Sequence, residues 1–180
     1  MSCNCDSQYI GRMGHNLLVY KSNAITPAYS AHPPGAPIIA GTIEVPCAFF
    51  NTEGESTIEW LRIVEKVDNA ANIRTPSLRV HLMNAAPATA PTVGVPYNPE
   101  VDKWQCTILV ETGYTTASDP FVKWRKGGPL ISEAWCLPQI IAKGASSSTS
   151  LWFCVAADNA PYTPVSPTEI YVSFGIRRHR

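Results

Sequence analysis

The sequence predicts an all-β protein, built as a two-sheet β-sandwich or jelly-roll-like domain with an extended N-terminal arm. Short runs rich in β-branched and aromatic residues recur between turn-forming residues. The 16 prolines in the 180-residue chain interrupt almost every window long enough to form a helix. Hydrophobic residues make up 45% of the chain and charged residues 16%, a globular composition that is sufficient for one core.

The first 40 residues differ from the rest and are interpreted as the arm. Residues 16–20 have the composition of a short strand. Residues 31–37 contain three prolines, which remove backbone donors and fix φ, so this segment is neither a helix nor a central strand. We therefore expect an arm over residues 1–40 that runs along this subunit or a neighbour. A sandwich domain over residues 41–180 follows, ending in a short basic C-terminal tail.

Two predicted strands in this domain show clear two-residue alternation. In residues 77–84, Leu78, Val80 and Leu82 point to one face, while Arg79, His81 and Met83 point to the other, as in a half-buried strand. This pattern predicts that His81 lies at the surface or in an interface. In residues 169–176, the face formed by Ile170, Val172, Phe174 and Ile176 is apolar, and the other face holds Tyr171, Ser173 and Gly175. Further strands are predicted at residues 42–50, 56–66, 103–111, 117–124, 135–141 and 151–156, with a long loop at 85–99.

Charge and motifs argue against an enzyme. Lysine plus arginine and aspartate plus glutamate both total 14, and a neutral chain has no overall electrostatic attraction for nucleic acid or an anionic membrane. The sequence contains no P-loop, dinucleotide-binding fingerprint, nucleophile elbow or zinc-protease helix motif. We therefore expect no catalytic residues, no cofactor, no metal site, and neither nucleic acid nor membrane as a partner.

The chain has six cysteines, and we interpret most of them as buried free thiols. Four lie in apolar strand-like runs, and the N-terminus has no apolar export signal, so a disulfide framework is the less favoured alternative. The sequence leaves open whether Cys3 and Cys5 pair or bind a metal. The cysteines are Cys3, Cys5, Cys47, Cys106, Cys136 and Cys154.

Five tryptophans raise a second possible function. Tryptophan is common in cores and interfaces because it buries a large area at low entropic cost. The alternative is a glycan-binding sandwich used for attachment, which tryptophans exposed along a groove would favour. A hydrolase with a loop-built site is the third and weakest reading. The tryptophans are Trp60, Trp104, Trp124, Trp135 and Trp152.

Two sequence blocks resemble a family of capsid decoration, or cement, proteins of tailed phages. These blocks are STIEWLRIVEK at residues 56–66 and PSLRVHLMNAAP at 76–87. Residues 103–110, 137–138, 150–157, 163–164 and 170–175 follow in the order found in that family. The chain departs from the family pattern at Met83, where phenylalanine is frequent, and at Cys106, where glycine is common. Residues 1–28 do not match the pattern.

The resemblance implies a virion structural protein of the β-sandwich type. Such a subunit stabilises the phage head by bridging capsomers on the capsid exterior, after synthesis in the host cytoplasm. Its implied partners are the major capsid protein and copies of itself, most simply as a homotrimer. We assign the capsid or subunit contact to the arm and the basic C-terminus. The residues are Tyr9, Ile10, Arg12, Leu17, Val19, Tyr20, Arg177, Arg178 and Arg180.

Overall fold

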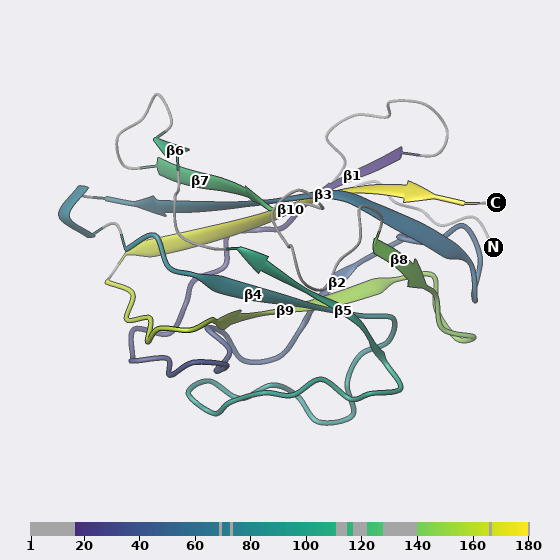
Figure 1. The fold of residues 1–180 in the computed structure, drawn as a ribbon, viewed down its shortest axis with the longest axis horizontal. Helices are drawn as coiled ribbons and strands as arrows, with labels where there is room; N and C mark the ends of the chain where they lie inside the picture. Colours follow the sequence, from purple (N-terminus) through teal and green to yellow (C-terminus); the bar gives the residue numbers. More distant parts are fainter. Residues whose placement is uncertain are drawn as a thin grey trace.

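The computed structural model describes residues 17–68, 70–72, 74–110, 115–116, 122–127, 140–165 and 167–179. It forms two antiparallel sheets packed face to face, which confirms the predicted all-β sandwich (Figure 1). The six-stranded sheet contains β1 (Leu17–Lys21), β3 (Glu55–Val67), β6 (Thr115–Thr116), β7 (Val122–Gly127), β8 (Ile140–Lys143) and β10 (Thr168–Arg178). The four-stranded sheet contains β2 (Ile43–Val45), β4 (Leu78–Met83), β5 (Trp104–Val110) and β9 (Leu151–Ala157). A 3₁₀ turn, η1 (Ala70–Asn72), follows β3.

The strand pairing is that of a jelly roll. In an eight-stranded jelly roll, the first strand pairs with the last, the second with the seventh, the third with the sixth and the fourth with the fifth. Here β1 pairs with β10, β2 with β9 and β4 with β5, while β3 pairs with both β7 and β8 in the sixth position. Strands β7 and β8 overlap the predicted strands at 117–124 and 135–141, whose remaining residues lie outside the described part of the chain.

The core lies between the sheets and follows the predicted alternation. Every second residue of β10 from Ile170 to Ile176 is fully buried, and Leu78, Val80 and Leu82 of β4 face them from the other sheet. Phe174 and Phe153 meet edge to face, with ring centroids 5.2 Å apart. The two apolar strand faces predicted from the sequence are therefore the two sides of one core.

The predicted boundary between arm and sandwich at residue 40 is wrong for residues 17–40. Strand β1 pairs along its whole length with β10, and Leu18 and Tyr20 are buried in the core. Farther along, Ile25, His32 and Pro37 form isolated bridges to β10, to the loop before it and to β9, respectively. The prolines do exclude regular structure, but this segment supplies core side chains and single backbone pairs. Residues 1–16 lie outside the described residues.

The basic end of the chain is not a separate tail, at least as far as residue 179. Arg177 and Arg178 belong to β10 and pair with β3. Arg178 lies over the Phe50 ring, with its guanidinium carbon 4.4 Å from the centroid, and it donates a hydrogen bond to the carbonyl of Cys47. The domain itself therefore holds these residues in place, because strand pairing continues to the end of β10.

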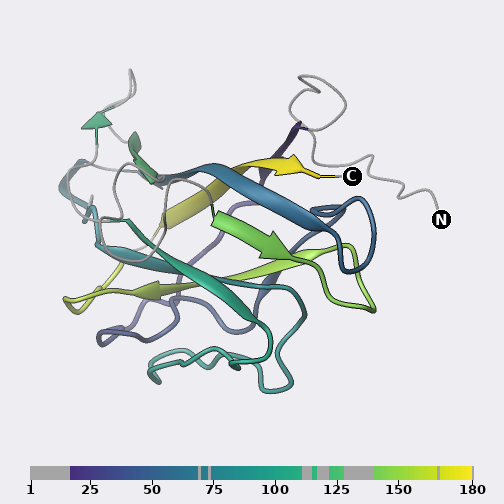
Figure 2. The same cartoon turned by 45° about the vertical axis from the view of Figure 1, so that its right-hand side comes forward.

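Part of the outer face of the four-stranded sheet is covered, and His81 is buried there, so the prediction that His81 is a surface or interface residue is wrong. The connection at residues 84–103 lies on the far side of this sheet from the other sheet (Figures 1 and 2). Its Tyr97 packs edge to face on His81, and the Tyr97 hydroxyl donates to the sulfur of Met83 at 3.4 Å. Burial, reinforced by the charge of Arg79, lowers the pKa of His81 to about 4.

The expectation of free thiols holds for two of the described cysteines and is wrong for a third. Cys106 and Cys154 are buried thiols that form no disulfide, whereas Cys47 is disulfide-bonded. Burial raises the pKa of the Cys154 thiol to about 12, so this side chain stays protonated and unreactive.

The assignment of β1 to the core can be tested by truncating Tyr20. Its ring contacts Phe153 and Phe174 at centroid distances of 6.4 Å, and its hydroxyl donates to the Glu44 carbonyl. We expect Tyr20→Ala to lower the free energy of unfolding by about 3–5 kcal/mol. Val19→Ala, on the outer face of the same strand, should cost about 1 kcal/mol or less. Denaturant melts of the two variants measure their free energies of unfolding. If Tyr20→Ala lowers this free energy by as little as Val19→Ala does, the assignment of β1 to the core is wrong.

The burial of His81 predicts a pH-dependent stability. Because its pKa is lower in the folded than in the unfolded chain, acid protonates the unfolded state first. The stabilisation is therefore complete above pH 6.5 and is lost as the pH falls towards 4. The loss should be about 3 kcal/mol. Denaturant melts between pH 4 and 7 measure how the free energy of unfolding changes with pH, and this change should be smaller for His81→Gln than for the natural chain. If the free energies of the two proteins change with pH in parallel, the assignment to His81 is wrong.

Candidate functional site: the outer groove of the six-stranded sheet

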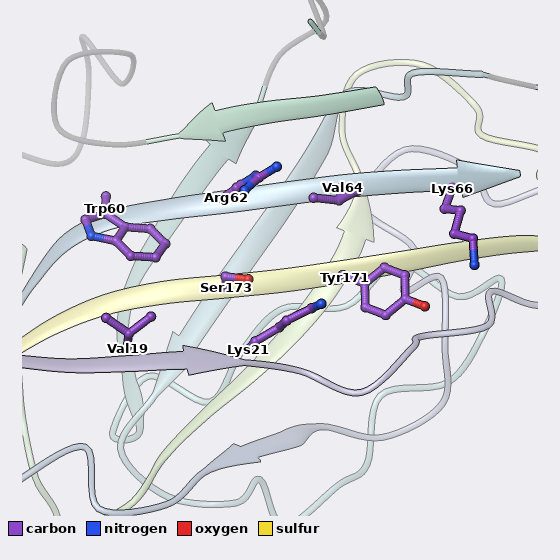
Figure 3. Close-up of a pocket in the computed structure, with 8 residues that line it drawn as sticks. All are labelled: Val19, Lys21, Trp60, Arg62, Val64, Lys66, Tyr171 and Ser173. Atoms are coloured by element: carbon purple, nitrogen blue, oxygen red, sulfur yellow. The ribbon is translucent and has the colours of Figure 1, made fainter. Parts of the chain in front are cut away.

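A groove of about 490 Å³ runs along the outer face of the six-stranded sheet. The described residues leave this groove open to solvent. Strands β1, β3 and β10 supply its walls and floor, and Figure 3 shows the side chains lying along these three strands. The lining residues are Val19, Lys21, Trp60, Arg62, Val64, Lys66, Tyr171 and Ser173. We refer to this feature as the outer groove.

The outer groove exists because β10 presents small residues between two rows of larger ones. In the strand register, Gly175 lies opposite both Val19 of β1 and Trp60 of β3. Two residues earlier, Ser173 lies opposite Arg62. Since alternate residues of a strand share a face, the small positions of β10 form a floor and the neighbouring strands form the walls.

The Trp60 indole packs directly on the backbone of Gly175 at one end of the outer groove. A Cβ added to Gly175 would lie 2.1 Å from Nε1 of Trp60, so the indole occupies the space that any side chain at 175 would need. A register irregularity between Gly175 and Ile176 marks the same place. An aromatic ring over a strand glycine restores packing that the missing side chain would have provided.

The polar side chains of the outer groove form a linked set. The Lys21 ammonium lies 4.9 Å from the centroid of the Tyr171 ring, in a cation–π arrangement. The Tyr171 hydroxyl donates to Oε2 of Glu169 at 2.8 Å, and Lys66 Nζ lies 3.4 Å from the same oxygen. The hydrogen bond from Tyr171 lowers the pKa of Glu169 and raises that of Tyr171, so the carboxylate stays ionised. Exposed Arg62 adds a further positive charge.

The structure brings three of the predicted contact residues to this face. Leu17 pairs with Arg177 in the register, and both share the outward side of the sheet with Val19. Arg177 forms an ion pair with Glu59. These residues lie at the end of the outer groove where β1 begins.

The other predicted contact residues are not part of this face. Tyr20 is 4% exposed and points into the core, so its assignment as a contact residue is wrong. Arg178 is engaged with Phe50, as described above. Tyr9, Ile10, Arg12 and Arg180 lie outside the described residues.

Sequence reasoning missed the β3 wall of the outer groove. The run from Trp60 to Lys66 alternates, with Leu61 and Ile63 buried and Arg62 and Val64 outward, and this period was visible in the sequence. What could not be seen is that β10 lies beside β3 with its smallest residues level with Trp60 and Arg62. That alignment depends on the register of strands more than a hundred residues apart in the chain.

The outer groove has the character of a binding surface, with aliphatic and aromatic side chains beside positive charges. In the part of the chain that the structure describes, no three histidine, cysteine or acidic side chains gather as metal ligands would. Nor does this part contain a helix of the length and hydrophobicity needed to span a bilayer.

Comparison with known proteins assigns this chain to no family. The chain matches no protein-family model, and no curated protein matches it. Among solved structures, it is similar to a chain of a marine algae virus of the order Picornavirales, at 12% identity and a TM-score of 0.24. The similarity covers 89% of this chain and 66% of the viral chain, so this chain spans just under two thirds of the length of the chain it matches. The jelly-roll assignment rests on the strand pairing and not on this similarity.

The dependence of Trp60 on Gly175 can be tested with a double-mutant cycle. We expect Gly175→Ala to destabilise the protein by about 1–3 kcal/mol, because the new methyl group displaces the indole. In a Trp60→Ala background, the same change should cost much less, since its clash is gone. Denaturant unfolding of the four proteins gives the coupling energy. Additive effects of the two changes would contradict the close packing.

Proposed function

We propose that this protein is a non-enzymatic virion structural subunit that decorates the exterior of a phage capsid and bridges capsomers. Its outer groove is the docking face. The observation that carries the proposal is the composition of that face. An antiparallel sheet with one face in water normally alternates apolar inward and polar outward residues. Here Val19, Trp60, Val64 and Tyr171 point outward together with positive charges.

Such a face suits a contact with another protein. Outward apolar and aromatic side chains rimmed by charged ones are typical of interaction surfaces. Lys21, Arg62 and Lys66 place three cationic side chains along this face, which favours a partner surface that is locally acidic.

The resemblance to tailed-phage decoration proteins supports the same function. The sequence blocks that carry it fall on β3, β4, β5, β9 and β10, which are central or paired strands of both sheets. The resemblance therefore concerns the part of the chain that builds the sandwich. Jelly rolls are widely used in viral capsids, although lectins and cupins also use them.

The partners follow from this proposal. The major capsid protein would supply the acidic surface, and copies of this chain would associate, most simply as a homotrimer at a local three-fold position. A decoration subunit acts through many weak contacts repeated over the particle, so avidity replaces high affinity at a single site.

The proposal is tested first on particles and then on variants. Quantitative mass spectrometry of purified virions should find the protein in copy numbers of the same order as the major capsid protein. Co-sedimentation with capsids that lack the protein should then show weaker binding for Arg62→Glu, by about tenfold or more, because the charge is reversed within the docking face. Asp102→Lys is the matched control, since it reverses an exposed charge in the connection on the opposite side of the sandwich.

Two results would count against the proposal in different ways. Absence of the protein from purified particles would refute a virion role. Normal capsid binding by a folded Arg62→Glu variant, with weak binding by Asp102→Lys, would place the docking face on the other sheet.

A further inference from the structure

A second depression, of about 390 Å³, lies on the opposite side of the sandwich. It is formed by the outward faces of β4 and β5 together with the last residues of the connection at 84–103. Its polar and aromatic lining is provided by Arg79, His81, Asn98, Trp104, Gln105 and Thr107. We refer to it as the β4–β5 pocket.

Trp104 is the main aromatic surface of the β4–β5 pocket. The side chain is 43% exposed, one of the most exposed large hydrophobic residues in the described structure. Its indole Nε1 donates to Oγ1 of Thr107 at 3.1 Å, which fixes the orientation of the ring while leaving much of its surface in solvent. A rigid, partly exposed indole is a preformed stacking surface, and little entropy is lost when a ligand covers it.

His81 forms part of the wall of the β4–β5 pocket and supports Thr107. The side chain is 5% exposed, and Nδ1 is hydrogen-bonded to the same Oγ1 of Thr107 at 2.8 Å. Nε2 has no hydrogen-bond partner among the described residues. Because Nε2 is itself buried, His81 acts on the pocket through Thr107, whose hydroxyl it helps to orient. The lowered pKa keeps the imidazole neutral at pH 7, which suits a neutral partner.

The charges of the β4–β5 pocket are balanced. Arg79 forms an ion pair with Asp158, whose side chain is only 2% exposed. The Arg79 guanidinium also donates a hydrogen bond to the amide oxygen of Asn159 at 3.4 Å. Gln105 is held in place because its Oε1 accepts the backbone N–H of Lys143 at 2.8 Å. The pocket therefore offers amides and a hydroxyl around an indole, and its one arginine is paired with Asp158.

We propose that the β4–β5 pocket binds a neutral oligosaccharide, with one sugar ring stacked on Trp104 and its hydroxyls bonded to the side-chain amides of Asn98 and Gln105. Sugar hydroxyls both donate and accept, so they match amide groups, which do the same. Single-stranded nucleic acid requires a positively charged groove and several stacking platforms, and an acidic glycan requires unpaired cations. Neither requirement matches the balanced charges around this single indole.

This inference does not depend on the proposed capsid function. The two sites lie on opposite outer faces of the sandwich, because the outer groove belongs to the six-stranded sheet and the β4–β5 pocket to the four-stranded sheet. A subunit docked through the outer groove would leave the β4–β5 pocket facing away from the capsid. The same molecule could then stabilise the particle and hold it to a carbohydrate surface.

The test uses the full chain and defined carbohydrates. A printed array of neutral, sialylated and sulfated oligosaccharides identifies a binding probe, and isothermal titration calorimetry then measures its affinity. We expect a neutral probe to bind, and Trp104→Ala to weaken it by about tenfold or more. Trp104→Phe should retain most of the affinity because a ring remains. Thr107→Val should weaken binding by a smaller factor, since it removes the oxygen that orients both Trp104 and His81.

Trp60→Ala is the matched control, because it removes a tryptophan from the opposite face and should leave the affinity unchanged. Thermal melts confirm that each variant is folded. The proposal is overturned if no neutral oligosaccharide binds at millimolar concentration, or if binding is equally strong in Trp104→Ala. It is also overturned if only sulfated or sialylated probes or a single-stranded oligo(dT) bind. Loss of binding in Trp60→Ala but not in Trp104→Ala would assign the carbohydrate to the outer groove instead.

Discussion

The aromatic contact between Phe153 and Phe174, closed by Tyr20, joins the two sheets, and the rest of the structure depends on it. Phe174 lies in β10 and Phe153 in β9, so the contact links the central strands of the two layers. Tyr20 reaches both rings from β1. Burial of these rings sets which side of each strand faces inward, and therefore which residues remain outside to form a site.

Among the described residues, a long connection lies across the outer face of the four-stranded sheet, whereas the six-stranded sheet has an open groove on its outer face. The connection at residues 84–103 covers much of the four-stranded sheet, burying His81 and leaving a small pocket beside Trp104. The outer groove of the six-stranded sheet stays open, and its floor is the small outward residues of β10. One face is therefore a broad basic and apolar surface, and the other a compact neutral pocket. This difference underlies the assignment of separate partners to the two faces.

Individual residues show how far sequence reasoning reaches towards the sites. Val19 was selected from its apolar character alone, and it does line the outer groove. Tyr20 was selected for the same reason, but β1 pairs with β10 in a register that turns it into the core. His81 follows the predicted alternation and points outward, yet a loop covers it. Alternation assigns a side chain to one of two faces, but it does not determine what lies against that face.

The sequence by itself determined the secondary structure class, the apolar face of β4 and of β10, and the absence of α-helices among the described residues, because these follow from local periodicity and proline placement. Tertiary structure alone decided that residues 17–40 belong to the sandwich, that Cys47 forms a disulfide, and that Trp60 rests on Gly175. Each of these depends on pairing between segments distant in the chain. Strand register is set by the combined burial of many side chains, and no single segment encodes it.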